Sequence, residues 1–393
     1  VSFLGIIVGI ITGLAPGVHI NLISVLLFSV SPFLLGYASA LHLAIFIVAV
    51  AVTHAFLDAL PSIFLGAPEE ATALAVLPGH RMLLEGKGYE AVFLIVLGSL
   101  IALLLAVAAV PLVSVVTPFI YEATKALIPY LLILVSVFLI WRERKSRFWA
   151  FFIFSLSGIL GIAVLNFPNL SQPLFPLFSG LFGTSTLLFS FHENAKIPKQ
   201  IVSEVDIGSK EAVPAIVTSV GVGAFVFILP GLGPSQAAII GAQIARKLTS
   251  RGFMMMVGGL NTVNMLMSFV TLYSIEKARN GAVVIISQFL ETFNVQLLVL
   301  FIGIILLVGG IATFLTIKLT KVFSKIIVHI PYRSLVLSVL GFIALLVFLI
   351  SGFYGFIILV TATFVGMLPS LQDIGKNHLM GSLILPIILF FLL

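Results

Sequence analysis

The sequence is poor in charged residues and has no cysteine. Its 393 residues include 20 Lys and Arg and 14 Asp and Glu, so charged residues make up 9% of the chain, while hydrophobic residues make up 61%. A soluble domain carries about 25% charged residues, which cover its surface. A lipid bilayer accepts an apolar exterior, so this composition excludes a soluble protein and predicts a membrane protein.

The missing cysteine excludes disulfides, thiol catalysis and metal or iron–sulfur sites with cysteine ligands. The HExxH, nucleophile-elbow, Walker and GxGxxG patterns are absent as well, so we expect no enzyme, no cofactor and no bound metal. A net charge of +6 is compatible with nucleic-acid binding, but the basic residues lie in short loops between apolar runs. That pattern is typical of membrane topology, and we expect no nucleic-acid partner.

Apolar runs long enough to cross about 30 Å of hydrocarbon recur along the whole chain. They predict about ten spans, near residues 38–60, 91–117, 124–141, 148–166, 172–190, 252–274, 293–317, 334–350, 352–368 and 376–393. The predicted fold class is therefore an all-α polytopic protein that crosses the cell membrane many times.

Two further apolar stretches, 1–36 and 212–248, are interrupted at their centres. The first break is Pro16-Gly17, and the second runs from Pro230 to Pro234. Each arm would have about 14–18 residues, or about 21–27 Å of helix, which reaches mid-membrane or a little beyond. We therefore expect each stretch to form a re-entrant helical hairpin.

Lysine and arginine cluster in three regions, 142–147, 246–251 and 318–333. If all three regions face the cytoplasm, the 212–248 stretch must leave the membrane on the same side from which it entered. Counting back from the first region then puts the loop with His80, Arg81 and Lys87 inside. The two hairpins are thus predicted to enter the membrane from opposite faces.

The two breaks belong to similar signatures, because Gly9 precedes Pro16-Gly17 by the same distance as Gly223 precedes Pro230-Gly231. Later segments also pair at offsets of about 201 to 214 residues, as a duplicated unit requires. We predict one repeat over 1–200 and a second over 201–393, each with a hairpin and about five spans. Basic loops of one repeat project onto uncharged stretches of the other, so we expect inverted orientations. Inverted repeats with interrupted helices are typical of secondary transporters, which bind substrate between the repeats.

The helix that begins after each break is expected to bind an anion. Broken backbone is tolerated at membrane depth only inside protein or beside water, and a helix start offers free N–H groups there. The alternative is that Pro and Gly only kink long helices for packing. The predicted substrate-binding residues are Pro16, Gly17, Val18, His19, Asn21, Pro230, Gly231, Gly233, Ser235, Gln236, Asn261 and Asn264.

Four polar residues in the apolar spans need an explanation, because such residues are costly in lipid. His54 and Asp58 lie four apart on one helix face, which suits a proton-accepting pair or a cation site for ion coupling. A structural His–Asp contact is the alternative. Asn261 and Asn264 lie three apart at the corresponding place of the second repeat, where amides bind carboxylate, sodium or a neighbouring helix.

The paired signatures, Gly9-x3-Gly13-x2-Pro16-Gly17-Val18 and Leu229-Pro230-Gly231-Leu232-Gly233, resemble the large membrane subunit of tripartite tricarboxylate transporters (TctA). The resemblance covers most of the chain and is greatest to the compact archaeal branch. It implies uptake of citrate-like carboxylates driven by an ion gradient, with a small membrane subunit and an extracytoplasmic binding protein as partners. His19 and Asn21 depart from the Gly/Ser-rich stretch of the family, and the first break is also distantly similar to the turn of polyprenyl-phosphate translocases.

These observations predict a secondary active transporter that moves an organic anion, a di- or tricarboxylate such as citrate, by alternating access in symport with Na⁺ or H⁺. A polyprenyl-phosphate translocase is the alternative, with a lipid phosphate as the anion. An intramembrane enzyme that uses His54 and Asp58 is a third class. The expected partners are membrane lipids and either the two partner subunits or a second copy in a homodimer.

Overall fold

The chain is mostly helical in the part that the computed structural model describes, which comprises residues 1–15, 24, 27, 31–66, 72–143, 145–168, 170–192, 197–229, 232–245, 248–290 and 292–393. Its α-helices are α1 (Ser2–Leu14), α3 (Ser31–Leu34), α4 (Ala40–Leu57), α5 (Ala59–Phe64), α6 (Ala73–Leu84), α7 (Gly88–Thr124), α8 (Ile128–Arg142), α9 (Arg147–Leu165), α10 (Leu174–Phe178), α11 (Ser185–His192), α12 (Ser209–Val226), α13 (Pro234–Ile244), α14 (Ser250–Ile275), α15 (Gly281–Phe289), α16 (Val295–Ile326), α17 (Tyr332–Leu371) and α18 (Gly381–Leu392). Short 3₁₀ segments η1 (Lys125–Leu127), η3 (Ile327–His329) and η4 (Lys376–Met380) and the π-helical segment η2 (Ser179–Thr184) adjoin them. No strand occurs in these ranges, so the all-α prediction is confirmed.

Within the described ranges, seven helical stretches are long and apolar enough to cross a membrane. They are Ala40–Phe64, Gly88–Thr124, Arg147–Leu165, Ser209–Val226, Ser250–Ile275, Val295–His329 and Val336–Leu371. The runs expected near 124–141, 172–190 and 376–393 correspond to shorter apolar helices. The prediction of a polytopic membrane protein is confirmed.

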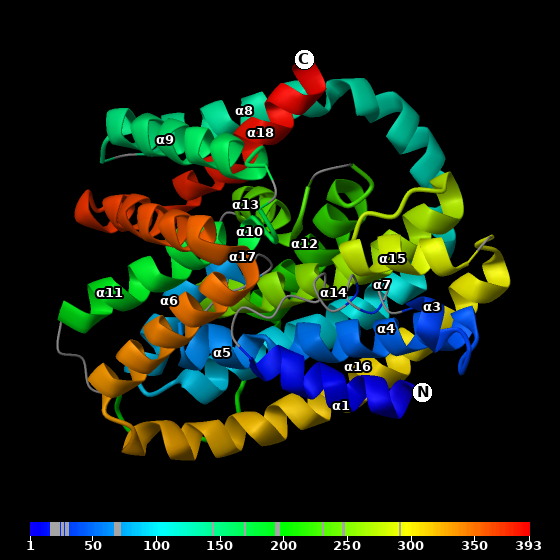
Figure 1. Cartoon of the computed structure of the whole chain (residues 1–393), viewed down its shortest axis with the longest axis horizontal. Coiled ribbons are helices and arrows are strands. Elements are labelled where there is room, and N and C mark those ends of the chain that lie inside the picture. Colours follow the sequence, from blue (N-terminus) through cyan, green and yellow to red (C-terminus); the bar gives the residue numbers. More distant parts are fainter. Residues whose placement is uncertain are drawn as a thin grey trace.

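The runs expected near 334–350 and 352–368 form one element, α17, which turns back on itself at Gly352. Gly352 has φ 67° and ψ −164°, a backbone conformation that favours glycine. Gly355 lies against the side chains of Ser351 and Val347 beside this kink, and Figure 1 shows the second arm leading back from the kink and diverging from the first arm. The two expected spans are therefore the two arms of α17.

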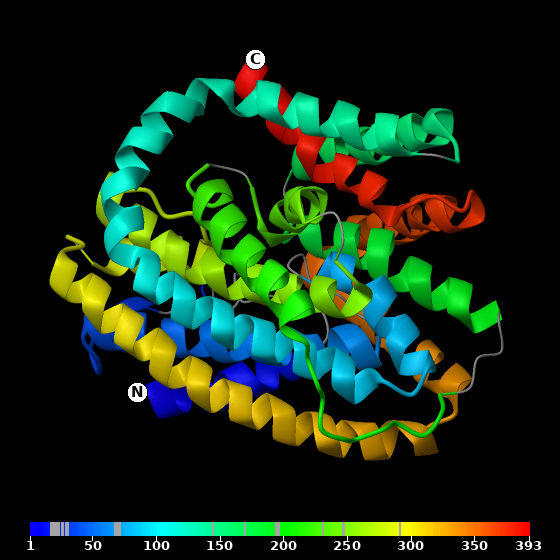
Figure 2. The ribbon, with the colours of Figure 1, turned by 180° about the vertical axis from the view of Figure 1, so that it is seen from behind.

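Helices α7 and α14 form the centre of the fold and cross with their backbones in contact. Gly98 lies against the backbone of Met255, and Gly258 lies against the backbone of Ile95, because neither glycine has a side chain to hold the helices apart. Beyond this crossing α7 curves around the outside of the molecule (Figure 2), with Pro111 and Pro118 inside the helix. Proline removes a backbone hydrogen bond, which explains the curvature.

Two helix pairs flank this centre, and in each pair the helices run in the same direction. Along α1 and α4, Gly5 lies against Ala49 and Gly9 against Thr53. Along α12 and α14, Ser219 Oγ contacts the Met256 carbonyl (3.1 Å), and Gly223, one turn further along α12, lies against Val263, two turns further along α14. Since α1 and α4 are parallel, α4 begins at the face where α1 begins.

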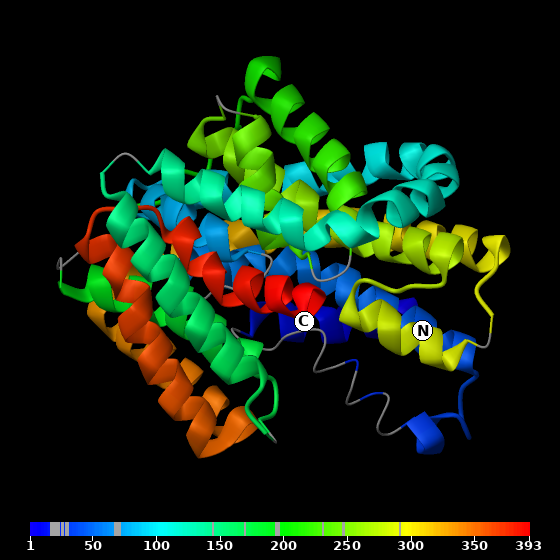
Figure 3. The ribbon, with the colours of Figure 1, turned by 90° about the horizontal axis from the view of Figure 1, so that it is seen from above.

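A second group of helices contains α8, α9, α18 and the later arm of α17 (Figure 3). Here Gly161 of α9 lies against the backbone of Ser382 in α18, and Gly366 of α17 lies against the backbone of Leu181 in η2. The glycine belongs to the first half of the chain in one contact, Gly161, and to the second half in the other, Gly366. These two glycines are about 200 residues apart in the sequence, and so are their partners Ser382 and Leu181, which is the spacing of a duplicated unit. The two contacts thus relate to each other as the predicted repeats would.

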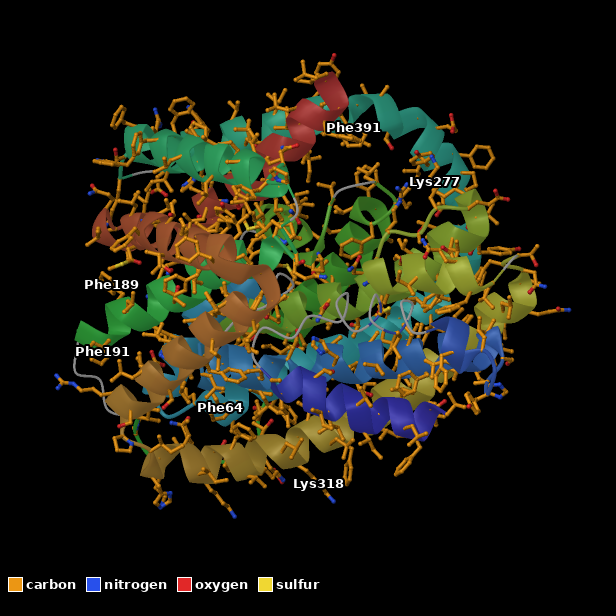
Figure 4. All side chains as sticks on the ribbon, viewed as in Figure 1. Phe64, Phe189, Phe191, Lys277, Lys318 and Phe391 are labelled. Carbon is orange, nitrogen blue, oxygen red and sulfur yellow. The ribbon has the colours of Figure 1, made fainter. Side chains whose placement is uncertain are left out.

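The two ends of the molecule differ in charge. At one end, the basic face, Arg251 pairs with Glu90 (2.7 Å) and Glu211 (3.2 Å), and Lys145 pairs with Asp373. At the opposite face Lys277 donates to the Tyr121 hydroxyl (2.9 Å). Figure 4 shows Lys277 and Phe191 at opposite ends of the structure. The starts of α7, α12 and α14 and the ends of α8 and α17 therefore share the basic face.

The two close backbone contacts of the second group generate a stability prediction. Gly161→Ala and Gly366→Ala would each press a methyl group into a carbonyl oxygen of the neighbouring helix, which cannot rotate away. We expect each change to lower the free energy of unfolding by about 1 to 3 kcal/mol. Thermal unfolding of the purified protein in detergent measures it. Gly341→Ala in α17 is the control, since nothing lies within 4 Å of its added methyl group, and equal stability of all three variants would contradict the prediction.

Candidate functional site

The second predicted hairpin is built from α12 and α13. Gly241 near the end of α13 lies against Thr218 in the middle of α12, so the chain reverses direction between the two helices. The reversal lies between Phe227 and Gly233. Pro230 and Gly231 lie outside the described residues, as do Pro16, Gly17, Val18, His19 and Asn21 of the first predicted hairpin.

Three predicted site residues lie at the start of α13 inside the protein. Gly233 is the N-cap residue and Pro234 the first helical residue, a position that suits proline because the N–H it lacks would have no helical partner. Ser235 is fully buried and Gln236 is 2% exposed. Gln236 Oε1 accepts the N–H of Gly233 (2.9 Å), which fixes the side chain against the helix start.

The other end of the Gln236 amide is the unusual feature of this helix start. Its Nε2 is buried and has no hydrogen-bond partner among the residues that the structure describes. An unpaired buried donor costs about 1 to 3 kcal/mol. The amide N–H₂ and the free N–H groups of the first turn all donate, so together they suit an anion or another acceptor.

His54 and Asp58 lie where α4 ends, and each is 2% exposed. His54 Nδ1 is 3.2 Å from Thr12 Oγ1 on the neighbouring α1. Asp58 is the residue between α4 and α5: its N–H donates to the His54 carbonyl (2.9 Å), and its own carbonyl accepts from Ser62 (3.1 Å). The pair therefore lies at a helix junction in the protein interior, and His54 faces α1.

Asn261 connects the two halves of the chain. Its Nδ2 donates to the Ala55 carbonyl (3.3 Å), one residue after His54. Gly223, near the end of α12, lies against Val263, so the turn after α12 lies close to the level of the asparagine pair. Asn264 makes no side-chain hydrogen bond among the described residues. The structure thus brings His54, Asp58 and Asn261 together around the end of α4.

Sequence reasoning missed a buried lysine at the basic face. Lys376 begins η4 and is 8% exposed, and its Nζ donates to Thr186 Oγ1 (2.6 Å) and Ser185 Oγ (3.3 Å). Two cavities, of about 430 Å³ and 560 Å³, are both lined by Lys376 and Thr186. The only signal in the sequence is one lysine at the start of an apolar run.

Two polar residues near Lys376, His378 and Glu143, interact with each other. His378 Nε2 is 3.2 Å from Glu143 Oε2 in the loop after α8. Burial opposes ionisation of Glu143, but the hydrogen bond from His378 and backbone N–H groups of Lys145 and Gly375 outweigh it and hold the pKa of Glu143 below its usual value. The carboxylate is therefore charged at neutral pH and committed to His378.

The loop expected around His80 and Arg81 is not a loop at these two residues, because both lie within α6, which continues through Pro78 and Gly79. Gly79 lies against Ile63 and Met254 there, so helix packing takes precedence over the local turn signal. His80 is consequently buried at 3% exposure, with its Nδ1 3.3 Å from the Ile63 carbonyl.

The bond between Asn261 and Ala55 gives a matched pair of variants. Asn261→Leu removes a donor that joins α14 to α4, and we expect it to lower the free energy of unfolding by about 0.5 to 1 kcal/mol, the usual value of a hydrogen bond between membrane helices. Asn264→Leu, the same change one turn further along, removes no such bond and serves as the control. Unfolding in detergent measures both, and an equal loss in the two variants would contradict the assignment.

Comparison with known proteins agrees with this architecture. The model of the tripartite tricarboxylate transporter TctA family matches residues 1–381. An uncharacterized protein of Methanocaldococcus jannaschii is 29% identical over 398 residues, which cover 99% of this chain and 98% of that protein. No solved structure matches the chain. The chain therefore belongs to the tripartite tricarboxylate transporter TctA family, and it is a multi-pass membrane subunit of a transport system.

Proposed function

We propose that this protein is a secondary active transporter for an organic anion, a di- or tricarboxylate such as citrate, and that it works by alternating access. Membership of the family indicates a transporter, and the donors at the site support a negatively charged substrate. The proposal depends mainly on the start of α13, where a buried helix N-terminus and the unpaired Gln236 Nε2 present hydrogen-bond donors. A carboxylate accepts from such donors and is favoured by the helix dipole.

The substrate site in this proposal lies between two hairpin tips. Gly233, Ser235 and Gln236 supply the second tip, and Pro16–Asn21 with Pro230 and Gly231 complete the site. Asn261 and Asn264 lie on the helix beside the second tip and add amide groups. Very few basic residues of the sequence lie in the spans around this site, so the N–H groups of helix N-termini and side-chain amides bind the anion in this proposal.

The repeats 1–200 and 201–393 are part of the same proposal, with opposite orientations in the membrane. Two sets of contacts support it. The α1–α4 pair and the α12–α14 pair are both parallel, and the contacts Gly161–Ser382 and Gly366–Leu181 exchange partners between the halves. The positive-inside rule assigns the basic face to the cytoplasm, so the hairpins enter from opposite sides.

The coupling ion in this proposal is Na⁺ or H⁺, and His54 with Asp58 takes part in its binding. Burial of both side chains next to α1 supports this, since a buried histidine and carboxylate respond to protons and cations. The expected partners are a small membrane subunit and an extracytoplasmic binding protein, or a second copy of the chain. A polyprenyl-phosphate translocase is the competing function, because a phosphate suits the same donors.

Gln236→Glu tests the substrate site. The change keeps the size of the side chain but replaces an N–H donor by a negative oxygen, so we expect the apparent KM for citrate to rise about tenfold or more. Uptake of labelled citrate into liposomes under imposed Na⁺ and H⁺ gradients measures it. Gln296→Glu at the start of α16 is the exposed control. Unchanged uptake by Gln236→Glu would contradict the site, and no uptake of any di- or tricarboxylate by the unaltered protein would contradict the carboxylate function.

Asp58→Asn tests ion coupling in the same assay. The amide has the shape of the carboxylate but cannot be ionised, so we expect binding of citrate to persist while the gradient no longer stimulates uptake. Asp206→Asn in the exposed segment before α12 is the control. Full stimulation of Asp58→Asn by both gradients would show that Asp58 has no part in coupling.

A further inference from the structure

We propose that Lys376, with Ser185 and Thr186, forms a second oxyanion site at the basic face, separate from the start of α13. It would bind a carboxylate or phosphate group where the anion route meets the basic face. Its place on that route rests on the proposed function.

The first argument is the unbalanced charge of Lys376. Its ammonium group is buried and donates to two hydroxyl groups, which are neutral. Among the described residues no carboxylate forms an ion pair with it, because Asp373 pairs with Lys145 and Glu143 with His378. A buried charge without a counter-ion is costly, so an anion that reaches Lys376 gains a strong charge-assisted hydrogen bond.

The second argument is the space around this lysine. Both cavities reach Lys376 and Thr186, so an anion can approach the ammonium group from either one. Arg142 lines the first cavity and Arg81 the second, and both side chains are exposed at the basic face. Positive charge along low-dielectric walls concentrates anions at such a site.

The third argument is the direction of the first cavity. Along α13 it is lined by Ala238, Ile239, Ala242 and Gln243. Ile239 and Gln243 lie one and two turns after Gln236 on the same side of α13, so this cavity follows α13 from near the proposed substrate site towards the basic face. An anion leaving the start of α13 would meet Lys376 next.

A thiol-protection experiment tests the site directly. The chain has no cysteine, so Asn377→Cys introduces a single thiol into the lining of the first cavity. We would measure the rate of its alkylation by a charged maleimide in the full-length protein in detergent, with citrate, inorganic phosphate or chloride at equal ionic strength. Ser203→Cys, exposed in the segment before α12, is the control thiol.

We expect citrate or phosphate to slow alkylation of Asn377→Cys but not of Ser203→Cys, and chloride to slow neither. Adding Lys376→Gln should raise the apparent Kd for the protecting anion about tenfold to a hundredfold, the value of one charge-assisted hydrogen bond. Lys376→Arg should keep most of the protection. Lys321→Gln, an exposed lysine of α16, should leave the Kd unchanged.

Each outcome decides the proposal. Protection by citrate alone assigns a carboxylate, and protection by phosphate alone assigns a phosphate group; both support the site. No protection by either anion, or equal protection with and without Lys376, would overturn it. The thermal midpoint of each variant shows whether it is folded, and Lys376→Arg decides if the glutamine variant is not. Citrate uptake without protection refutes only this site, whereas protection without uptake refutes only the proposed transport function.

Discussion

Hydrocarbon offers no hydrogen-bond partner, and this constraint determines most of what the structure contains. Backbone groups are paired within helices, and buried hydroxyl groups donate to carbonyls of the preceding turn, as Ser185 does to Leu181 (2.7 Å). Longer polar side chains bridge between helices, as Asn261 does to Ala55. Several buried polar atoms depart from this pattern, and two of these groups, Gln236 Nε2 and the charge of Lys376, lie beside interrupted or irregular helix segments. We assign binding to Gln236 and Lys376 because their unpaired donor and unbalanced charge lie beside such segments.

Glycine determines how the helices assemble. Lipid does not drive apolar helices together, so their association depends on close packing, which Gly98, Gly258, Gly161 and Gly366 permit. The contacts divide the helices into a central group around α7 and α14 and a second group with α8, α9, α17 and α18. The cavity along α13 is lined from both groups, since Ala238 belongs to the first and Leu139 to the second. Alternating access requires movement at such a boundary.

The sequence was sufficient for the class of protein, most spans and the position of the second break. Each of these depends on local properties: apolar runs predict helices, and Pro234 after Gly233 predicts a helix start. It failed at the loop expected around His80 and Arg81, which belongs to α6, where Gly79 packs against Ile63 and Met254. It also missed Lys376, because a single lysine in a sequence says nothing about which hydroxyl groups or cavities surround it. The repeats and the first hairpin tip stay predictions.

By itself the sequence determined that the chain lies in a membrane and is helical, because composition and hydrophobic run length are properties of the chain, and its paired Pro-Gly signatures resemble those of a transporter family. Only the tertiary structure decided which polar groups meet. Asn261 and Ala55 are 206 residues apart, and Lys376 lies 190 residues from Thr186. Contacts of this kind depend on how helices cross, and the crossing is fixed by glycines at positions whose partners come from the other half of the chain.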